Sequence, residues 1–494
     1  MKTKHERTIR FQSTHPIDLM QHIRFNFTLL LLLTAGILHG APSDTLTSFG
    51  VTWKFDRPVE NGTFITGDPW IIGPAQVIAI TNDKNDPNFS PKKGQNGSML
   101  NPLSDPKGRN HQGYDESLNS YKESLNAALP NGEPVSGSNP IQLRAGDSLI
   151  SMVSWLYNSQ SDAEAGIPSF NGGTKAPRPV TRSASILTVL DKAPPANSFR
   201  PPYVKDFRGK FHTLNEIRWD RLKNLPAPSS APDANRLIQK VDRPWVDHVF
   251  EYLGAMVHPS EHMPNYGRDM GNIIGNATLL VNTDIPLKQK QQLSIYLIQY
   301  GIDLTGIADA GGGWRANGGH ALGRKWPILF TGILLDDSHM LEVGEWDRTF
   351  NQGVEFQEDQ NYFYVSDAEV DLTNSSKWKP DHRNVKKGQA NPYTEQDIGM
   401  PEWGIRHAYK PQSDNNHMNA VYRDINGGVA PAFALAALIM GGRDAWNHEA
   451  FFDYQDRYMS HPERPARGTN AVDSFVQNMW EMYRKDYPPV WTSK

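Results

Sequence analysis

The chain has 494 residues, a formal net charge of −4 and no cysteine. Its length exceeds that of a typical single domain, so two domains are predicted. The absence of a basic excess argues against nucleic acid as the main partner. The lack of cysteine excludes a thiol nucleophile and a cysteine-ligated metal.

The N-terminus resembles an export signal. Basic residues precede the apolar run "FTLLLLLTAGIL" at 27–38, which is too short to span a bilayer, and small residues suited to cleavage follow near Gly40 or Ala41. We therefore predict a signal peptide over 1–41, a secreted or periplasmic protein, and no stable membrane partner after signal removal. An uncleaved membrane anchor is the alternative.

Short runs rich in Val, Ile, Thr and aromatic residues predict strands at 51–55, 70–81, 147–157 and 184–190. Asn-Gly and Ser-Gly turns separate them. We therefore predict a β-sandwich-like domain over 45–204.

A Pro-rich linker follows, after which the periodicity becomes helical. Apolar periodicity predicts helices at 214–225, 243–257, 269–282, 286–308, 325–335, 427–440, 444–459 and 470–486. Long helices joined by Gly-rich loops, without alternating strands, predict an all-α second domain over 212–494. The fold class is thus multidomain α+β. The long loops carry most of the Trp, His and Arg residues, as expected of a binding site on a rigid scaffold.

A first candidate cluster lies in "WVDHVFEYLGAMVHPSEHMPNYGRD", residues 245–269. If this segment is helical, His248, Glu251 and His258 lie near one face, where a carboxylate can orient an imidazole. The structural alternative is a partly buried polar stripe. A zinc site from the same three side chains, or from His258 and His262, is a second alternative, although no HExxH motif occurs.

A second cluster lies in "GGGWRANGGHALGRKWPILF", residues 311–330, where Arg315, His320 and Arg324 sit on glycine-rich backbone before an apolar helix. Glycine allows close approach of a ligand, and an arginine fork suits a carboxylate or sulfate. The N-terminus of the helix also favours anions. This segment is either a loop that caps a helix or one wall of a cleft for an acidic ligand.

A third cluster covers residues 395–428 and contains Glu402, Trp403, Arg406, His407, Asn415, Asn416, His417, Tyr422 and Arg423. Trp403 could stack on a sugar ring, and Tyr422 could transfer a proton. Arg406 and Arg423 could hold acid groups. A large structured loop is the alternative. No nucleophile elbow or phosphate-binding loop occurs, which excludes the common serine-hydrolase and NTPase patterns.

The phrases "NYGRDM", "GGHALGRKWPILF" and "DIGMPEWGIRH" resemble a group of exported proteins related to alginate and glucuronan lyases, such as polysaccharide lyase family 38. "NNHMNAVY" resembles the Asn-His segment of other alginate-lyase toroids. The resemblance covers residues 243–459. It implies that residues 212–494 form an α/α toroid that cleaves an acidic polysaccharide by β-elimination at uronic acids, with no cofactor and no metal.

The resemblance also implies roles. His258 would be the acid/base group oriented by Glu251, Arg315 would neutralise the substrate carboxylate, and Tyr422 would be the second proton-transfer group, with His320 a further catalytic candidate. The implied substrate-binding residues are Tyr266, Arg268, Trp314, Arg324, Trp403, Arg406, His407, Asn416, His417 and Arg423.

Two other classes stay open. A glycoside hydrolase needs two carboxylates flanking the scissile bond, and Glu251, Asp309, Glu395, Asp397 and Glu402 leave that open. A non-catalytic glycan-binding protein would bind the same polymers without turnover. One loop, "NDKNDPN", could also hold calcium, with a solvated turn as its alternative.

Overall fold

The structure is a computed structural model in which residues Ile37–Lys494 form one compact unit. It describes residues 39–81, 95–102, 114–115, 120–121, 135–154, 181–204, 210–247, 267–316, 319, 321–346, 354–360, 364–378, 392–402, 421–462, 464–468 and 470–488. The first strand begins at His39. The predicted signal peptide thus lies outside the described residues except for its last three positions.

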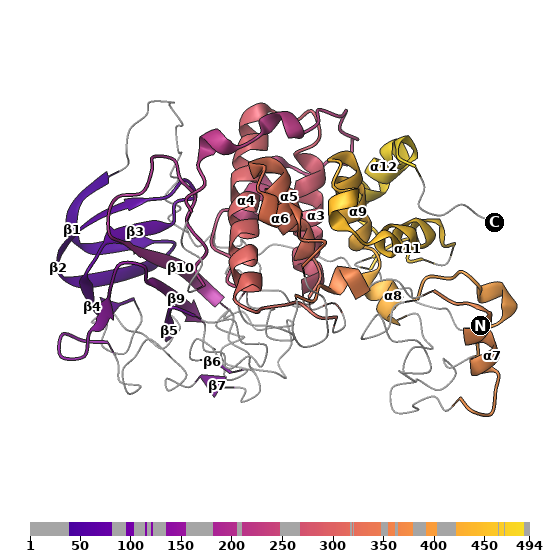
Figure 1. Ribbon diagram of the computed structural model, residues 1–494, viewed down its shortest axis with the longest axis horizontal. Coiled ribbons are helices and arrows are strands. Elements are labelled where there is room, and N and C mark those ends of the chain that lie inside the picture. Colours follow the sequence, from indigo (N-terminus) through magenta and orange to yellow (C-terminus); the bar gives the residue numbers. More distant parts are fainter. Residues whose placement is uncertain are drawn as a thin grey trace, which may run out of the picture. The chain divides into compact units, whose positions relative to one another are not determined.

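The N-terminal part is rich in strands (Figure 1). They are β1 (His39–Ser48), β2 (Val51–Thr63), β3 (Pro69–Ile72), β4 (Ala75–Ile80), β5 (Gln95–Leu100), β6 (Tyr114–Asp115), β7 (Ser120–Tyr121), β8 (Ile141–Leu143), β9 (Ser148–Ser154) and β10 (Thr181–Leu190). Eight of them form one sheet in the order β5-β9-β10-β3-β2-β4-β8, with β1 paired to β2. This sheet curls into a half-barrel.

Strand β2 shows why the sheet has one strongly apolar face. Its buried residues Val51, Trp53 and Phe55 alternate with more exposed neighbours, as the two-residue period of a strand requires. The turn from β1 into β2 places Phe49 at φ 45° and Gly50 at φ 79°. Positive φ at both central residues is the geometry that joins antiparallel strands with the correct twist.

The prediction of a β-sandwich is wrong. One face of the sheet surrounds an apolar cluster that includes Trp53, Phe55 and Leu187. On β9 and β10, residues such as Ile150 and Ile186 belong instead to the large core shared with the helices. Helices therefore take the place of a second sheet. The strand pattern could not show this, because it reveals only that a face is covered.

The helices of two turns or more are α2 (Ala234–Val241), α3 (Gly267–Leu280), α4 (Leu287–Asp309), α5 (Lys325–Leu335), α7 (Asp367–Thr373), α9 (Ala430–Ile439), α11 (Glu449–Ser460) and α12 (Ser474–Tyr483). Shorter elements are α6 (Ser338–Leu341), α8 (Val421–Asn426), α10 (Arg443–Trp446) and the 3-10 turns η6 (Leu214–Glu216), η7 (Trp219–Arg221), η10 (Gln357–Gln360), η11 (Glu395–Asp397) and η12 (Arg484–Asp486).

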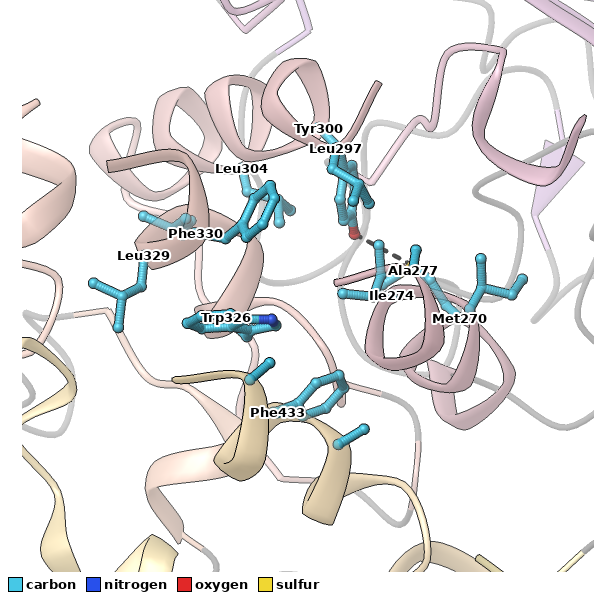
Figure 2. Close-up of a cluster of buried hydrophobic side chains, with 14 of the residues drawn as sticks. Met270, Ile274, Ala277, Leu297, Tyr300, Leu304, Trp326, Leu329, Phe330 and Phe433 are labelled. Carbon is cyan, nitrogen blue, oxygen red and sulfur yellow. Dashed lines mark hydrogen bonds between the residues drawn. The ribbon is translucent and has the colours of Figure 1, made fainter. Parts of the chain in front are cut away.

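The helical core forms where α3, α4, α5 and α9 meet (Figure 2). Each of these helices contributes a large side chain to the core, and each of these side chains is at most 1% exposed. They are Met270 of α3, Leu297 of α4, Trp326 of α5 and Phe433 of α9. Tyr300 donates a hydrogen bond to the sulfur of Met270 at 3.2 Å, so even the polar tip of this core residue has a partner.

The prediction of an α/α toroid is also wrong. Helix α9 is buried along its whole length and packs against α3, α5, α10, α11 and α12. Helix α5 is likewise buried at every position. A helix that is apolar on every side needs neighbours on every side. The described helices thus surround buried helices, whereas the inner helices of a toroid present one face to a central cleft.

Three predicted helices need a further correction. Residues 214–225 contain the 3-10 turns η6 and η7, and the N–H of Arg218 donates to the carbonyl of Leu334 rather than within a helix. Residues 444–459 are split at Asn447, whose φ of 51° ends α10 before α11 begins. Residues 243–247 are not helical, and the rest of that segment lies outside the described residues.

Within the part of the chain that the structure describes, no helix is both long enough and apolar enough to cross a membrane.

Candidate functional site

The candidate site, here called the α8 cluster, consists of Glu402 and the polar side chains around helix α8: Arg268, Tyr393, Arg423, Asp424, Asn426, Tyr454 and Tyr458. Its centre is an ion pair in which Nη1 of Arg423 donates to Oε1 of Glu402 at 2.5 Å. Glu402 is 3% exposed and Arg423 is 4% exposed. Both side chains are therefore shielded from water. Ionising a carboxyl group costs more free energy in such a buried environment than in water.

Burial raises the pKa of Glu402 to about 8; the guanidinium of Arg423 opposes the shift and the nearby charge of Asp424 adds to it. A carboxyl that titrates near neutral pH can act as a general acid or a general base. Asp424 itself lies 3.4 Å from Nε of Arg423, so the single cation faces two carboxyl groups.

Three tyrosines lie near this pair. Burial, together with the charge of Glu402, raises the pKa of both Tyr393 and Tyr454 well above the usual value. Burial and the charge of Asp424 raise the pKa of Tyr458 to about 12. Their hydroxyls are therefore protonated at neutral pH, and they are weak acids that can give a proton only to a stronger base, such as a departing alkoxide.

The α8 cluster brings together parts of all three sequence clusters. Nη1 of Arg268 donates to the carbonyl of Ile425 and to Oδ1 of Asn470, each at 3.1 Å. Gly319, next to His320 in the sequence, is so close that an added Cβ would lie 2.2 Å from Oδ1 of Asn426 and 3.5 Å from Cβ of Arg268. A side chain at position 319 would therefore force the buried amide of Asn426 to move.

Several buried polar atoms of the α8 cluster have no hydrogen-bond partner among the described residues. They are both side-chain atoms of the Asn426 amide, Nε of Arg268 and the hydroxyl of Tyr458. Asn426 is 1% exposed and Tyr458 is fully buried. Buried polar atoms are seldom left unsatisfied in folded proteins, and such atoms often mark functional positions.

The glycine-rich segment 311–330 has a different purpose in the structure. Gly311, at φ 86°, ends α4, and the N–H of Gly312 closes the helix on the carbonyl of Ile307 at 2.9 Å. At the start of α5, Oε1 of Glu358 accepts hydrogen bonds from the backbone N–H groups of Gly323, Arg324 and Lys325 at 2.8, 2.9 and 3.3 Å. The anion at this helix N-terminus is thus supplied by the chain itself.

Arg324 is committed to an internal ion pair. Nε and Nη2 donate to the two oxygens of Asp247 at 2.8 and 3.2 Å, and Nη1 donates to the carbonyl of Leu322 at 2.7 Å. Both side chains are 1% exposed. Tyr300 also donates to Asp247, at 3.1 Å. The helix-capping interpretation of this segment accounts for these contacts.

Trp314 and Arg315 lie beside the segment that precedes η10. Trp314 is 2% exposed and stacks on Phe356 with 5.6 Å between ring centroids. Arg315 is half-buried. Burial raises the pKa of the Glu355 carboxyl, and the positive charge of Arg315 partly opposes this increase.

Most of the predicted site residues lie outside the described residues. They are the catalytic candidates Glu251, His258 and His320 and the substrate-binding candidates Tyr266, Trp403, Arg406, His407, Asn416 and His417. Tyr422 belongs to α8, but its side chain is not described. The candidate calcium loop and the candidate zinc ligands His248, Glu251 and His258 also fall outside. Among the residues that are described, no group of three His, Cys, Asp or Glu side chains could hold a metal ion.

Sequence reasoning missed five members of the α8 cluster, namely Tyr393, Asp424, Asn426, Tyr454 and Tyr458. Tyr454 and Tyr458 are four residues apart on α11, which puts them on one face of that helix. This spacing was visible, but it matches ordinary core packing equally well.

No family model, curated protein or solved structure shows significant similarity to the chain.

Proposed function

We propose that this protein is a carbon–oxygen lyase that cleaves a uronic-acid-containing polysaccharide, alginate-like or glucuronan-like, by β-elimination, with the α8 cluster as its acid/base centre. The observation that carries the proposal is the buried carboxyl of Glu402, with a pKa of about 8, in contact with Arg423 and close to Tyr454. An acid/base group that titrates near neutral pH, next to a cation and a hydroxyl, meets the needs of this reaction.

Elimination needs three groups. A base removes the proton at C5, the C4–O4 bond breaks as a C4–C5 double bond forms, and an acid protonates the departing O4. A cation must also neutralise the neighbouring carboxylate, because negative charge develops there. In this proposal Glu402 is the base and Tyr454 is the acid. Arg268 and Arg423 supply the positive charge, so no metal and no cofactor is needed.

Two features of the sequence support the same conclusion. Three segments resemble secreted lyases of uronate polymers. Arg268 of the first sequence cluster and Glu402 and Arg423 of the third belong to the α8 cluster. The N-terminal apolar run is typical of an export signal, so we also propose that the protein is secreted or periplasmic, where such polymers occur.

A glycoside hydrolase is the second candidate, and one observation favours it. A carboxyl with a pKa of about 8 is protonated at neutral pH, as the general acid of a hydrolase must be. Asp424 would then be the second carboxylate. Mass spectrometry of the products distinguishes the two reactions, because an eliminated fragment is one water lighter than a hydrolysed one.

The test is incubation with polymannuronate, polyguluronate, glucuronan and sulfated uronate polymers, followed by product masses. Unsaturated fragments from one polymer would support the lyase. Saturated fragments alone, with no unsaturated ones, would refute the lyase and favour the hydrolase. Binding without products would refute both and leave a glycan-binding protein.

A further inference from the structure

Glu402 follows a segment that has a small apolar cluster of its own, centred on the buried residues Val365 and Tyr393. The backbone of Val365 pairs with the stretch just before Glu402. Its N–H donates to the carbonyl of Met400 at 3.0 Å, and its carbonyl accepts from the N–H of Gly399 at 2.8 Å. The position of Glu402 therefore depends on where this paired backbone is held.

Arg457 of helix α11 contacts both sides of this pairing. Its Nη1 donates to the carbonyl of Gly399 at 3.3 Å, and its guanidinium lies over the ring of Tyr364, 4.2 Å from the ring centroid. Tyr364 in turn pairs with Pro401, the residue before Glu402. One side chain thus holds two stretches of backbone that meet beside the carboxyl group of the proposed base.

Asp453 fixes the orientation of Arg457. Nε of Arg457 donates to both carboxylate oxygens of Asp453, one turn earlier on α11, at 3.2 and 3.1 Å. The planar guanidinium can bind this carboxylate, the carbonyl of Gly399 and an aromatic face at the same time, which a lysine cannot do. Gly399 has a φ of 88°, and a Cβ there would lie 3.1 Å from Nη1 of Arg457, so glycine permits the close approach.

Helix α11 also carries Tyr454, the proposed acid, which is fully buried. Tyr454 and Arg457 are three residues apart, so they lie near one face of the helix. Arg423 anchors the end of the Glu402 side chain, whereas Arg457 anchors the backbone just before it. The docking of this backbone on α11 therefore sets the place of the proposed base relative to the proposed acid.

We propose that Arg457 is a positioning residue, which docks the backbone beside Glu402 on α11 and thereby sets the geometry between Glu402 and Tyr454. The inference rests on the function proposed above, in which these two groups are base and acid. Arg457 acts through Glu402 and does not touch the substrate. Its loss should let the Glu402 segment loosen, and a misplacement of a reacting group by about 1 Å can cost roughly 100-fold in rate.

The ionisation of Glu402 reports directly on this docking. The charged and titratable groups that act on it are Arg423 and Asp424 of α8, Tyr454 of α11, and Tyr393 and Asp397 of its own segment. Burial is the largest cause of its raised pKa. A loosened segment admits water, so the pKa of Glu402 should fall from about 8 toward its ordinary value of 4.5. A purely structural role of Arg457 would leave this pKa unchanged.

The experiment compares Arg457→Met with the matched control Arg443→Met. Arg443 makes the same three kinds of contact to partners outside the α8 cluster: the carboxylate of Glu449 at 2.6 Å, the carbonyl of Pro488 at 3.4 Å and the ring of Phe452 at 5.9 Å.

In Arg457→Met we expect kcat on the cleaved polymer to fall by about 10- to 100-fold with little change in KM, because the loss is confined to the transition state. The pH at which the rate levels off should move down by about one unit or more. Arg443→Met should keep the wild-type kcat and pH profile. If Arg457→Met does not fold, Arg457→Lys, which keeps the charge beside Asp453, should show the same changes to a smaller extent.

A second measurement needs no turnover. The pH dependence of the free energy of unfolding, compared between chains with Glu402 and with Glu402→Gln, gives the pKa of Glu402 in the wild-type and Arg457→Met backgrounds. If the wild type cleaves no uronate polymer, the proposed function fails, and this measurement still decides whether Arg457 positions Glu402. A Glu402 pKa that stays near 8 in Arg457→Met, or equal losses of kcat in Arg457→Met and Arg443→Met, would overturn the proposal.

Discussion

Two buried arginines, Arg324 and Arg423, were both predicted to contact an acidic substrate, and they differ sharply in their surroundings. All three nitrogens of the Arg324 guanidinium donate hydrogen bonds, and both oxygens of Asp247 accept. Arg423 donates from Nη1 to Glu402 and, at 3.4 Å, from Nε to Asp424, and nearby Asn426 and Tyr458 have polar atoms without a hydrogen-bond partner among the described residues.

The difference separates scaffold from candidate chemistry. A fully bonded buried pair costs much to disturb and offers nothing to a ligand. A buried pair with a carboxyl of pKa about 8 and unsatisfied neighbours retains a titratable proton near neutral pH. Burial of an arginine alone therefore does not indicate its role. Its role is indicated by whether the carboxylate that it contacts and the polar groups around that pair have all their hydrogen bonds.

The largest expected effect is on stability at the Arg324 pair. Asp247→Asn leaves the buried guanidinium without its counter-charge, so we expect a loss of about 3–5 kcal/mol in the free energy of unfolding. Urea denaturation measures it through the midpoint. Glu402→Gln should cost far less, since the carboxyl it replaces is already half neutral near pH 8. Equal losses in the two variants would remove the distinction between the pairs.

Next comes activity at the Arg423 pair. Glu402→Gln cannot accept a proton, so we expect the rate of polymer cleavage to fall by at least about 100-fold. The matched control is Glu60→Gln, at an exposed carboxylate on β2, which should retain the wild-type rate. Product formation by Glu402→Gln at more than a tenth of that rate would rule out Glu402 as the base.

A smaller effect is expected from Tyr454→Phe, which removes one hydroxyl and keeps the ring. We expect a loss of about 10-fold in kcat, because water can partly replace the proton donor. The Tm should fall far less than in Asp247→Asn, because the buried ring of Tyr454 is kept. A Tm that falls by several degrees with full activity would instead make Tyr454 part of the scaffold.

The most gradual effect is the pH dependence of stability, which develops over several pH units. Between the ordinary pKa of 4.5 and the folded value of about 8, Glu402 holds more proton in the folded than in the unfolded state. Stability therefore falls as pH rises through this window, by at most about 1.4 kcal/mol per pH unit from this group. Denaturation of wild type and Glu402→Gln across pH 5–8 should show a flatter dependence in the variant.

The sequence predicted local structure better than assembly. Helices α4, α5 and α9 were expected because their apolar runs are long and bounded by Pro or Gly. The four segments predicted as strands also contain strands in the structure, namely β2, β3 with β4, β9 and β10. The parallel pairing of β10 with β3 joins residues more than a hundred positions apart, and no local pattern encodes it. The same limit explains why a curled sheet covered by helices was taken for a sandwich.

The candidate site was predicted in part for the same reason. Arg268 and Arg423 stood out by residue type, and both belong to the α8 cluster. Arg324 stood out equally, yet its partner Asp247 lies 77 positions earlier in the chain. Residue type and spacing indicate which side chains are able to do chemistry. Only tertiary contacts determine which of these side chains already bind a partner within the protein.

The most direct test of the acid/base role is the rate of elimination as a function of pH, followed by the ultraviolet absorbance of the conjugated uronate product. If Glu402 is the base, it must be ionised, so the rate should rise with pH and level off above about 8. This rise should vanish in Glu402→Gln. A rate that falls through the same range, or no absorbance on any uronate polymer, would contradict the account.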